Sequence, residues 1–334
     1  MRSRTVMSIA SAAPIALFAG GAMAVTLTVD QHDLTCTPGA SPFCAIGEAV
    51  DAAGTGDEIV VEPGHYIENV TIDVSVALIS SGGRSVTVIE GISEVGSLGT
   101  IVISPNVDGV QIGDVDQGFT IIGIDNGNPG VENAAVYFDG DHTGAGVIGN
   151  KIVAAGDHGL LTEFGLTITD FEIRENEFAG TTFFPPPGTG NQFEVPNVPR
   201  QLVVMGGGAG GGNTSDITFS DNLITGTSGG VNLDGDQQGN TQVTIDAVGA
   251  VIHDNVFLGT TTGFGTSLRA RGPDTDIARN TFDDAGLSDS ACYIFVQEVG
   301  DTLGKIRGRN TFVDRQAIVD PAPNETTGAI CPRD

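Results

Sequence analysis

The segment Ile173-Arg174-Glu175-Asn176-Glu177-Phe178 contains a short phrase that recurs from the middle of the chain onward. Each copy has an aliphatic or aromatic residue, two spacers, an Asn, one spacer, and then Phe or Ile. The copies are centred on Asn150, Asn176, Asn222, Asn255, Asn280 and, in degenerate form, Asn310, at intervals of 26, 46, 33, 25 and 30 residues. The interval of 46 fits either two turns or one turn with an insertion. Repeats of about 20–50 residues indicate a solenoid or a propeller.

The residues around each Asn predict strands, because Val, Ile, Thr and Phe alternate with polar residues and Gly or Asn ends each run. Single short strands do not supply the four strands that each propeller blade needs. They fit a solenoid in which every coil adds one strand to each of several parallel sheets. The repeated Asn is then structural. Its amide satisfies main-chain groups in a turn that needs a left-handed residue, and stacked amides bond to one another.

The N-terminal part of the chain has a different pattern. Apolar residues at helical spacing predict a short helix from Ile46 to Ala53, ended by Gly54-Thr-Gly56, and 57–66 alternates as a strand. An amphipathic helix at the open end of a solenoid would cover the unpaired edge of the first coil. We therefore expect residues 25–66 to form an N-terminal cap and the first coil.

The Asn-centred repeat resembles that of the pectate-lyase-like superfamily, and Cys44-Ala-Ile-Gly-Glu-Ala-Val50 resembles the C-S-L-R-E-A-I cap of many secreted bacterial β-helices. Cys44, Glu48 and Ala49 match that cap, while Ala45 and Gly47 replace its Ser and Arg. The resemblance implies an all-β fold, a single-stranded right-handed parallel β-helix with three sheets and a short capping helix. It implies little about activity, because the superfamily includes lyases, hydrolases, esterases, epimerases and adhesins.

The first 24 residues predict a secretory signal peptide. Arg2 and Arg4 precede an apolar stretch that is too short to span a bilayer, and Ala22-Met23-Ala24 is a typical cleavage site. No later run is long and apolar enough to span a membrane. We therefore expect 25–334 to be one secreted β-helix domain, extracellular or periplasmic.

Four cysteines fit an oxidising compartment. Proximity along the chain favours the pairs Cys36–Cys44 and Cys292–Cys331 among the three possible connectivities. Metal binding through these cysteines is not indicated, since no C-x-x-C spacing occurs.

The charge balance limits the possible partners. The chain has 42 acidic and 14 basic residues among 334, a net charge of −28. Nucleic acid is excluded as an expected partner, because a polyanion would be repelled. Seven of the 14 basic residues lie between Arg269 and Arg315, where they would attract an acidic sugar locally. Part of this cluster also has a structural explanation, because Arg279 would lie one coil from Asp254.

A second set of strand-like segments can be aligned with the Asn repeat. Its members are Val136–Asp139, Leu160–Glu163, Leu202–Met205, Val231–Asp234, Leu268–Arg271 and Ile294–Gln297. If the first and third residues of each point inward, the second and fourth face outward. In enzymes of the superfamily that the repeat resembles, one such sheet forms the floor of the substrate groove. The resemblance therefore implies a location for a binding site on this sheet.

This outward stripe supplies the candidate site. We expect Asp139, Glu163, Asp234 and Arg271 to be catalytic, with Glu163 or Asp234 as acid/base and Arg271 as charge stabiliser. Tyr137, Asn232, Arg269 and His142 would contact substrate. Coils stack about 4.8 Å apart, so the carboxylates would lie one or two rungs apart, within the range of glycosidase pairs. The alternative is a ladder of paired surface charges without catalytic function.

Two similar phrases, Asp139-Gly-Asp141 and Asp234-Gly-Asp236, offer hard oxygen ligands from Asp141 and Asp236. Such ligands suit Ca²⁺, although no complete ligand loop is present and an Asx-rich turn explains the same pattern. The stretch 181–213 interrupts the repeat with Pro-rich and Gly-rich pieces and is predicted to be a loop insertion beside the groove.

Two functional hypotheses remain open at this point. In the first, the protein is a secreted β-helix that binds polysaccharide in a groove on one parallel sheet and cleaves it as a lyase or glycoside hydrolase. In the second, it is a noncatalytic exported surface, adhesive or structural protein in which the solenoid is a rigid rod. A deep groove over the outward stripe would favour the first, and a flat stripe the second.

Overall fold

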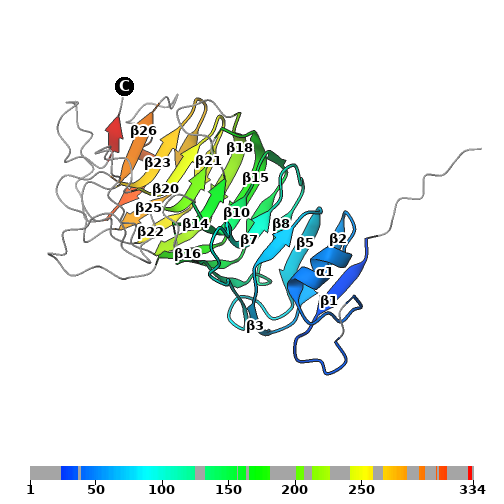
Figure 1. Cartoon of the computed structure of the whole chain (residues 1–334). Coiled ribbons are helices and arrows are strands. Elements are labelled where there is room, and N and C mark those ends of the chain that lie inside the picture. Colours follow the sequence, from blue (N-terminus) through cyan, green and yellow to red (C-terminus); the bar gives the residue numbers. More distant parts are fainter. Residues whose placement is uncertain are drawn as a thin grey trace, which may run out of the picture.

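A computed structural model of the chain describes residues 24–36, 39–124, 132–155, 157–162, 165–180, 201–206, 213–225, 241–258, 266–283, 293–297, 306, 308–313 and 330–332. Its strands stack along one axis (Figure 1). In successive coils the chain passes through three sheets in a fixed order, here named sheets I, III and II. Each strand pairs in parallel with the equivalent strand of the next coil. The predicted parallel β-helix is confirmed.

Sheet I contains β1 (Thr26–Val29), β2 (Asp57–Val61), β5 (Val76–Ser80), β8 (Gln111–Ile112), β12 (Gly146–Ile148), β15 (Ile168–Arg174), β18 (Ser215–Ser220), β21 (Val251–His253) and β24 (Asp276–Ala278), with β11 (His142–Thr143) pairing on β15. Sheet II contains β4 (Val70–Ile72), β7 (Gly99–Ile103), β10 (Ala134–Phe138), β14 (His158–Thr162), β17 (Gln201–Met205), β20 (Thr241–Asp246), β23 (Thr266–Arg271), β26 (Ile294–Gln297) and β28 (Ile330–Pro332). Sheet III contains β3 (Gly64–Ile67), β6 (Thr87–Glu90), β9 (Thr120–Ile122), β13 (Lys151–Ala154), β16 (Glu177–Gly180), β19 (Leu223–Thr225), β22 (Val256–Leu258), β25 (Thr281–Asp283) and β27 (Thr311–Phe312).

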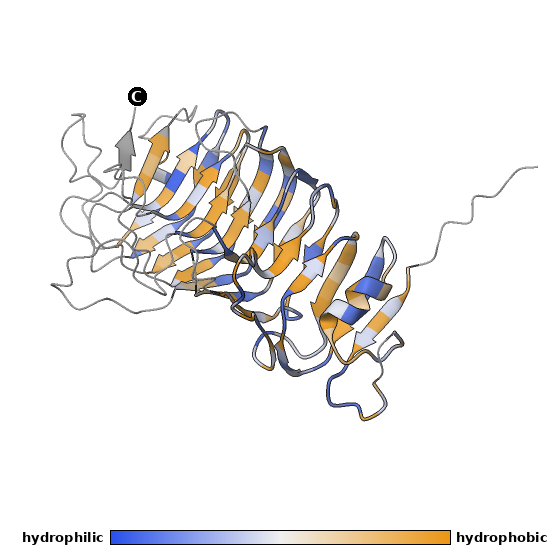
Figure 2. Ribbon diagram, in the orientation of Figure 1, coloured by the Kyte–Doolittle hydropathy of each residue, from blue (hydrophilic) through white to orange (hydrophobic). Residues whose placement is uncertain are grey.

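The core lies between the three sheets and is built from the inward half of each strand. Hydrophobic residues are concentrated on the strands (Figure 2). Equivalent side chains stack from coil to coil, as Phe257, Phe282 and Phe312 do with ring centroids 4.6 and 5.4 Å apart. The apolar residues flanking each Asn therefore form continuous columns, as the repeat predicts.

The repeated Asn residues form a hydrogen-bonded ladder between sheets I and III. The backbone N–H of Asn176 donates to Oδ1 of Asn222 at 3.0 Å, and that of Asn222 donates to Oδ1 of Asn255 at 3.0 Å. Each Nδ2 donates to main-chain carbonyls, as Asn222 does to Ile173 at 2.9 Å. The same pattern continues through Asn280 and Asn310. The Asn side chains thus satisfy buried main-chain groups of the coil beside them.

The left-handed residue of this turn is not the Asn itself but the residue before it. Gly149, Glu175, Asp221, Asp254 and Arg279 all have φ between 57° and 70°. Asp is among the non-glycine residues that tolerate this conformation best, whereas Glu175 and Arg279 adopt it at a cost. The ladder therefore fixes a conformation that the preceding residue would not adopt by preference.

The interval of 46 residues corresponds to one turn with additional chain, because β16 and β19 are direct neighbours. The predicted insertion 181–213 is not a single interruption. It includes β17 (Gln201–Met205), which pairs with β14 and β20 as a regular rung of sheet II. Residues 181–200 and 207–212 of that stretch lie outside the described residues.

Helix α1 (Ile46–Ala52) lies at the N-terminal end of the stack, next to β1 and β2 (Figure 1). Its buried face consists of Ile46, Ala49 and Val50. The Glu68 carboxylate, from the following coil, accepts hydrogen bonds from the backbone N–H groups of Ile46 and Gly47, both at 2.9 Å. A carboxylate at a helix N-terminus satisfies free donors and complements the helix dipole.

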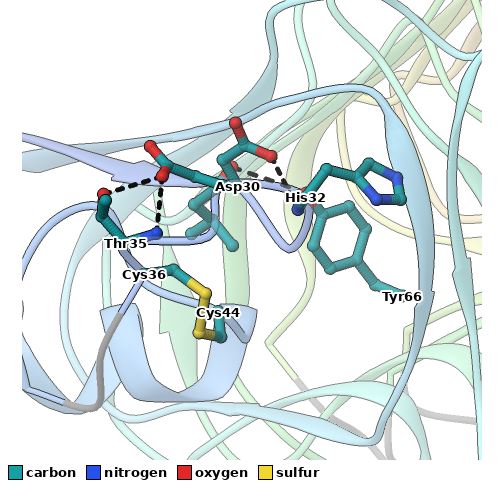
Figure 3. The surroundings of a disulfide bond; sticks show 8 residues. Asp30, His32, Thr35, Cys36, Cys44 and Tyr66 are labelled. Carbon is teal, nitrogen blue, oxygen red and sulfur yellow. Dashed lines mark hydrogen bonds between the residues drawn. A yellow bond between two sulfur atoms is a disulfide. The ribbon is translucent and has the colours of Figure 1, made fainter.

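A disulfide joins Cys36 to Cys44 and closes the loop that precedes α1 (Figure 3). Phe43, within this loop, exchanges main-chain hydrogen bonds with Thr28 and Asp30, so the loop lies along the outer edge of β1. This arrangement protects the first strand from pairing with another chain. The other predicted pair includes Cys292, and the predicted signal peptide lies almost entirely in residues 1–23. Both fall outside the described residues.

Asn222→Ala tests the ladder. It removes the acceptor of the Asn176 N–H and the donor to Ile173, leaving buried main-chain groups unpaired. We expect a loss of about 2–4 kcal/mol in the free energy of unfolding, measured by urea denaturation. Asn213→Ala, at an exposed position, is the control and should change the free energy of unfolding by less than about 0.5 kcal/mol. Equal small effects in both variants would contradict a stabilising ladder.

The predicted ion pair between Asp254 and Arg279 is present, with Nη2–Oδ2 and Nε–Oδ1 distances of 2.7 and 2.9 Å. These hydrogen bonds from Arg279 lower the pKa of Asp254. A carboxyl pKa that is lower in the folded state adds stability above the unfolded pKa of about 3.9, and that stability is lost as pH falls through the folded pKa.

We therefore expect Asp254→Asn to lower the melting temperature slightly at pH 7. The difference from the parent should disappear once the pH is below the folded pKa. Asp221→Asn is the matched control, because Asp221 occupies the same turn position one coil away without an ion pair among the described residues. A pH-independent difference for Asp254→Asn would show that the carboxylate charge is not what stabilises this turn.

Candidate functional site

The outward face of sheet II carries the candidate site. In β10, β14, β20, β23 and β26, alternate residues point into the core, among them Val136, Leu160, Val243, Leu268 and Ile294. The residues between them face away from it. Strand pairing places these outward residues in one line across the rungs, here called the outer row: Tyr137, Leu161, Val204, Thr244, Arg269 and Phe295.

The structure corrects two features of the predicted stripe. At β17 the register is shifted by one residue, because Val203 and Met205 are core residues and Val204 faces outward. The rung between β17 and β23 is Thr241–Asp246 and not Val231–Asp234. Thr244 and Asp246 therefore occupy the positions assigned to Asn232 and Asp234, which lie outside the described residues.

The outer row is withdrawn from solvent although it faces away from the core. Tyr137 is 5% exposed, Leu161 and Val204 are 1%, Thr244 is 4% and Arg269 is 9%. The outward faces of the other sheets differ. On sheet III, Ile67 is 60% and Leu258 37% exposed, and on sheet I Glu172 is exposed. Among the described residues, only sheet II has an outward face that buries a continuous line of side chains.

A second line, here called the rim row, lies two residues further along each strand. It contains Asp139, Gly206, Asp246, Arg271 and Gln297. Glu163, the residue after Thr162, would belong to it but lies outside the described residues. Gly206 has φ of 95°, and a Cβ there would lie 2.2 Å from the Asp246 carbonyl oxygen. Gly206 is therefore required, and one rung of the rim row has no side chain.

Asp246 and Arg271 form a two-pronged ion pair in the rim row. Nε of Arg271 donates to Oδ1 of Asp246 at 2.6 Å, and Nη2 donates to Oδ2. Their side chains are only 8% and 16% exposed. In the adjacent outer row, the Arg269 guanidinium lies 5.9 Å from the centroid of the Phe295 ring, a cation–π geometry. The two arginines therefore face outward on the same strand, as predicted, each beside a complementary group.

Other predicted site residues have structural surroundings. His142 is 1% exposed, and its Nδ1 and Nε2 lie 2.9 and 3.0 Å from the carbonyl oxygens of Val107 and Asp139. Both ring nitrogens face main-chain carbonyl oxygens inside the turn, so the structure gives His142 a structural setting and no support for the predicted substrate contact. Asp141 accepts a hydrogen bond from the backbone N–H of Thr167 at 2.7 Å.

No group of three or more His, Cys, Asp or Glu side chains within the described ranges could hold a metal ion. The Ca²⁺ prediction therefore has no support from Asp141. Its other predicted ligand, Asp236, is not among the described residues. The basic cluster after Arg269 is divided, because Arg279 and Arg309 form ion pairs with Asp254 and Asp276 on sheet I.

Comparisons with known proteins yield similarity of shape only. No protein-family model matches the chain, and no curated protein matches it. Among solved structures, pectin methylesterase from carrot is 16% identical with a TM-score of 0.48, covering 94% of this chain and 89% of that one. Alginate lyase from Paenibacillus sp. str. FPU-7 is 15% identical with a TM-score of 0.43, covering 92% and 99%. The parallel ladders, rather than these similarities, define the fold. Within the described ranges, no helix has the length and apolar character needed to cross a membrane.

The Asp246–Arg271 pair can be tested by a double-mutant cycle. Removing one partner leaves a partly buried charge without its counter-ion, so Asp246→Ala and Arg271→Ala should each cost about 2–3 kcal/mol of unfolding free energy. The double variant should lose clearly less than the sum, with a coupling of at least about 1 kcal/mol. Asp139→Ala, in the same row, is the control and should cost about 0.5 kcal/mol or less. Additive losses would contradict the pairing.

Proposed function

We propose that this protein binds an acidic polysaccharide on the outward face of sheet II, with the sugar chain crossing the rungs. One observation supports this most directly: this face withdraws a continuous line of side chains from solvent, and that line includes an arginine. A flat, exposed face would instead suit a rod. Ligand sites are typically recessed, largely apolar surfaces with a few fixed polar groups.

The composition of the face supports a sugar ligand that carries carboxylates. Arg269 and Arg271 are two of only 14 basic residues in a chain of net charge −28, and both face outward on β23. Guanidinium groups suit planar carboxylates. Tyr137 and Phe295 add aromatic surface to the outer row, and aromatic side chains combine large apolar area with limited flexibility. A repeating polymer also suits a surface whose rungs repeat at a fixed spacing.

Cleavage of the bound polymer belongs to the same proposal. Asp246 takes the position that the sequence assigned to Asp234, and Arg271 beside it would stabilise negative charge that develops on the sugar. Glu163 stays the predicted acid/base. The leader-like segment 1–24 and the Cys36–Cys44 disulfide support export to an oxidising compartment.

Affinity electrophoresis of the purified protein through gels containing uronate polymers or neutral polysaccharides tests this function. We expect retardation in the uronate gels alone, weakening as NaCl is raised, because salt screens charge contacts. Arg269→Ala should weaken binding about tenfold or more. Arg279→Ala removes the same charge on the sheet I side and should bind like the parent.

Incubation with the same polymers, monitored for reducing ends and for the absorbance of unsaturated products, separates hydrolase from lyase. Glu163→Gln should abolish any cleavage. Absence of binding across the whole panel would overturn the proposed function. Equal weakening by Arg269→Ala and Arg279→Ala would show that only net charge matters.

A further inference from the structure

Thr244 has a hydroxyl group without a hydrogen-bond partner among the described residues. It lies in β20, is 4% exposed, and its Oγ1 is fully buried. Buried hydroxyl groups are nearly always hydrogen-bonded, because the bonds lost to water must be replaced. An exception of this kind calls for a ligand, an internal water or a functional role.

The position of Thr244 favours a ligand. Val243 and Ile245 point into the core, so Thr244 faces outward between Val204 on one rung and Arg269 on the other. Asp246 lies two residues along the same strand and on the same face. The side chains of Asp246 and Arg271 are 8% and 16% exposed, so the neighbouring rim row touches solvent while the Thr244 hydroxyl itself is covered.

Packing alone does not explain a threonine here. Valine has the same shape, is already present on the preceding rung as Val204, and would bury no polar atom. A site built to hydrogen-bond a polar group of its ligand leaves its own buried donor or acceptor unpaired whenever that group is missing. Thr244 meets this condition between an apolar residue and a guanidinium group.

We propose that Thr244 is a specificity-determining residue of this face, whose hydroxyl pairs with an oxygen atom of the bound sugar. The inference rests on the proposed function and deepens it, because it assigns the hydrogen-bonding contact to β20, next to Arg269. The side chain makes this contact only when sugar is bound.

Thr244→Val and Thr244→Ser test the assignment in the full-length protein, with the uronate polymer that the parent binds as the probe. Thr244→Val should weaken binding about 3- to 10-fold, the effect of one neutral hydrogen bond. Thr244→Ser keeps the hydroxyl and should bind within about twofold of the parent. The melting temperature of free Thr244→Val should equal or exceed that of the parent, because an unpaired buried hydroxyl is replaced by a methyl group.

Thr214→Val is the matched control. Thr214 is 3% exposed, and its Oγ1 also has no partner among the described residues, but it lies in the turn before β18 and outside the outer row. Thr214→Val should have the same effect on the melting temperature as Thr244→Val, and it should bind the polymer as the parent does. Unchanged binding by Thr244→Val would overturn the inference, and so would a lower melting temperature, which would reveal a partner or an internal water in the free protein. If the parent itself binds no polymer, the proposed function fails. That result is distinct from a failure of the Thr244 assignment, in which the parent binds and Thr244→Val binds equally well or is less stable.

Discussion

The fixed distance between coils controls this structure. Parallel strands about 4.8 Å apart bring the same position of every coil into contact with its equivalents above and below. A side chain is disfavoured at a position where it cannot pack against the equivalent side chain of the next coil at that distance. The Asn ladder meets the constraint best, since each side-chain amide accepts from and donates to the backbone of the preceding coil, while the backbone N–H of the same Asn donates to the Asn of the next coil. It keeps the coils in register although the Asn intervals vary between 25 and 46 residues.

The same constraint explains how the candidate site is built. From Asn150 onward, each turn from a strand of sheet I to the next strand of sheet III carries the ladder and has two residues, as between Arg174 and Glu177. All variation in coil length falls elsewhere. The connections that enter sheet II are the longest, with 20 residues before β17 and 15 before β20. The solenoid thus keeps one corner invariant and allows the sequence beside sheet II to diverge, which is where loops commonly acquire function.

Some parts of the site could be read from the sequence. The outward placement of Tyr137, Arg269 and Arg271 follows from strict alternation, and the strand pairing agrees with it. The register at β17 could not be read, because Leu202-Val203-Val204-Met205 is apolar throughout and alternation carries no signal there. The Asn222–Asn255 interval contains two alternating runs, Val231–Asp234 and Thr241–Asp246, and alternation alone does not distinguish which of them pairs in the sheet. A usable signal was present: Asp246 precedes Asn255 by nine residues, the same number that separates Arg271 from Asn280. The unpaired hydroxyl of Thr244 has no sequence signature, since its burial depends on neighbours from other coils.

Stacking also determines how a chain of net charge −28 can attract an acidic polymer. Glu175, Asp221 and Asp254 occupy one turn column on consecutive coils, and unit charges one rung apart in water repel by about 0.9 kcal/mol before screening by salt. Arg279 interrupts that column by pairing with Asp254. Glu175 is likewise paired, with Arg174 at 2.8 Å, so most of the charge in this column is neutralised locally. The outward face of sheet II holds Arg269 and Arg271 within one strand. Since both positions belong to a parallel ladder, their charges are held by backbone register rather than by flexible loops.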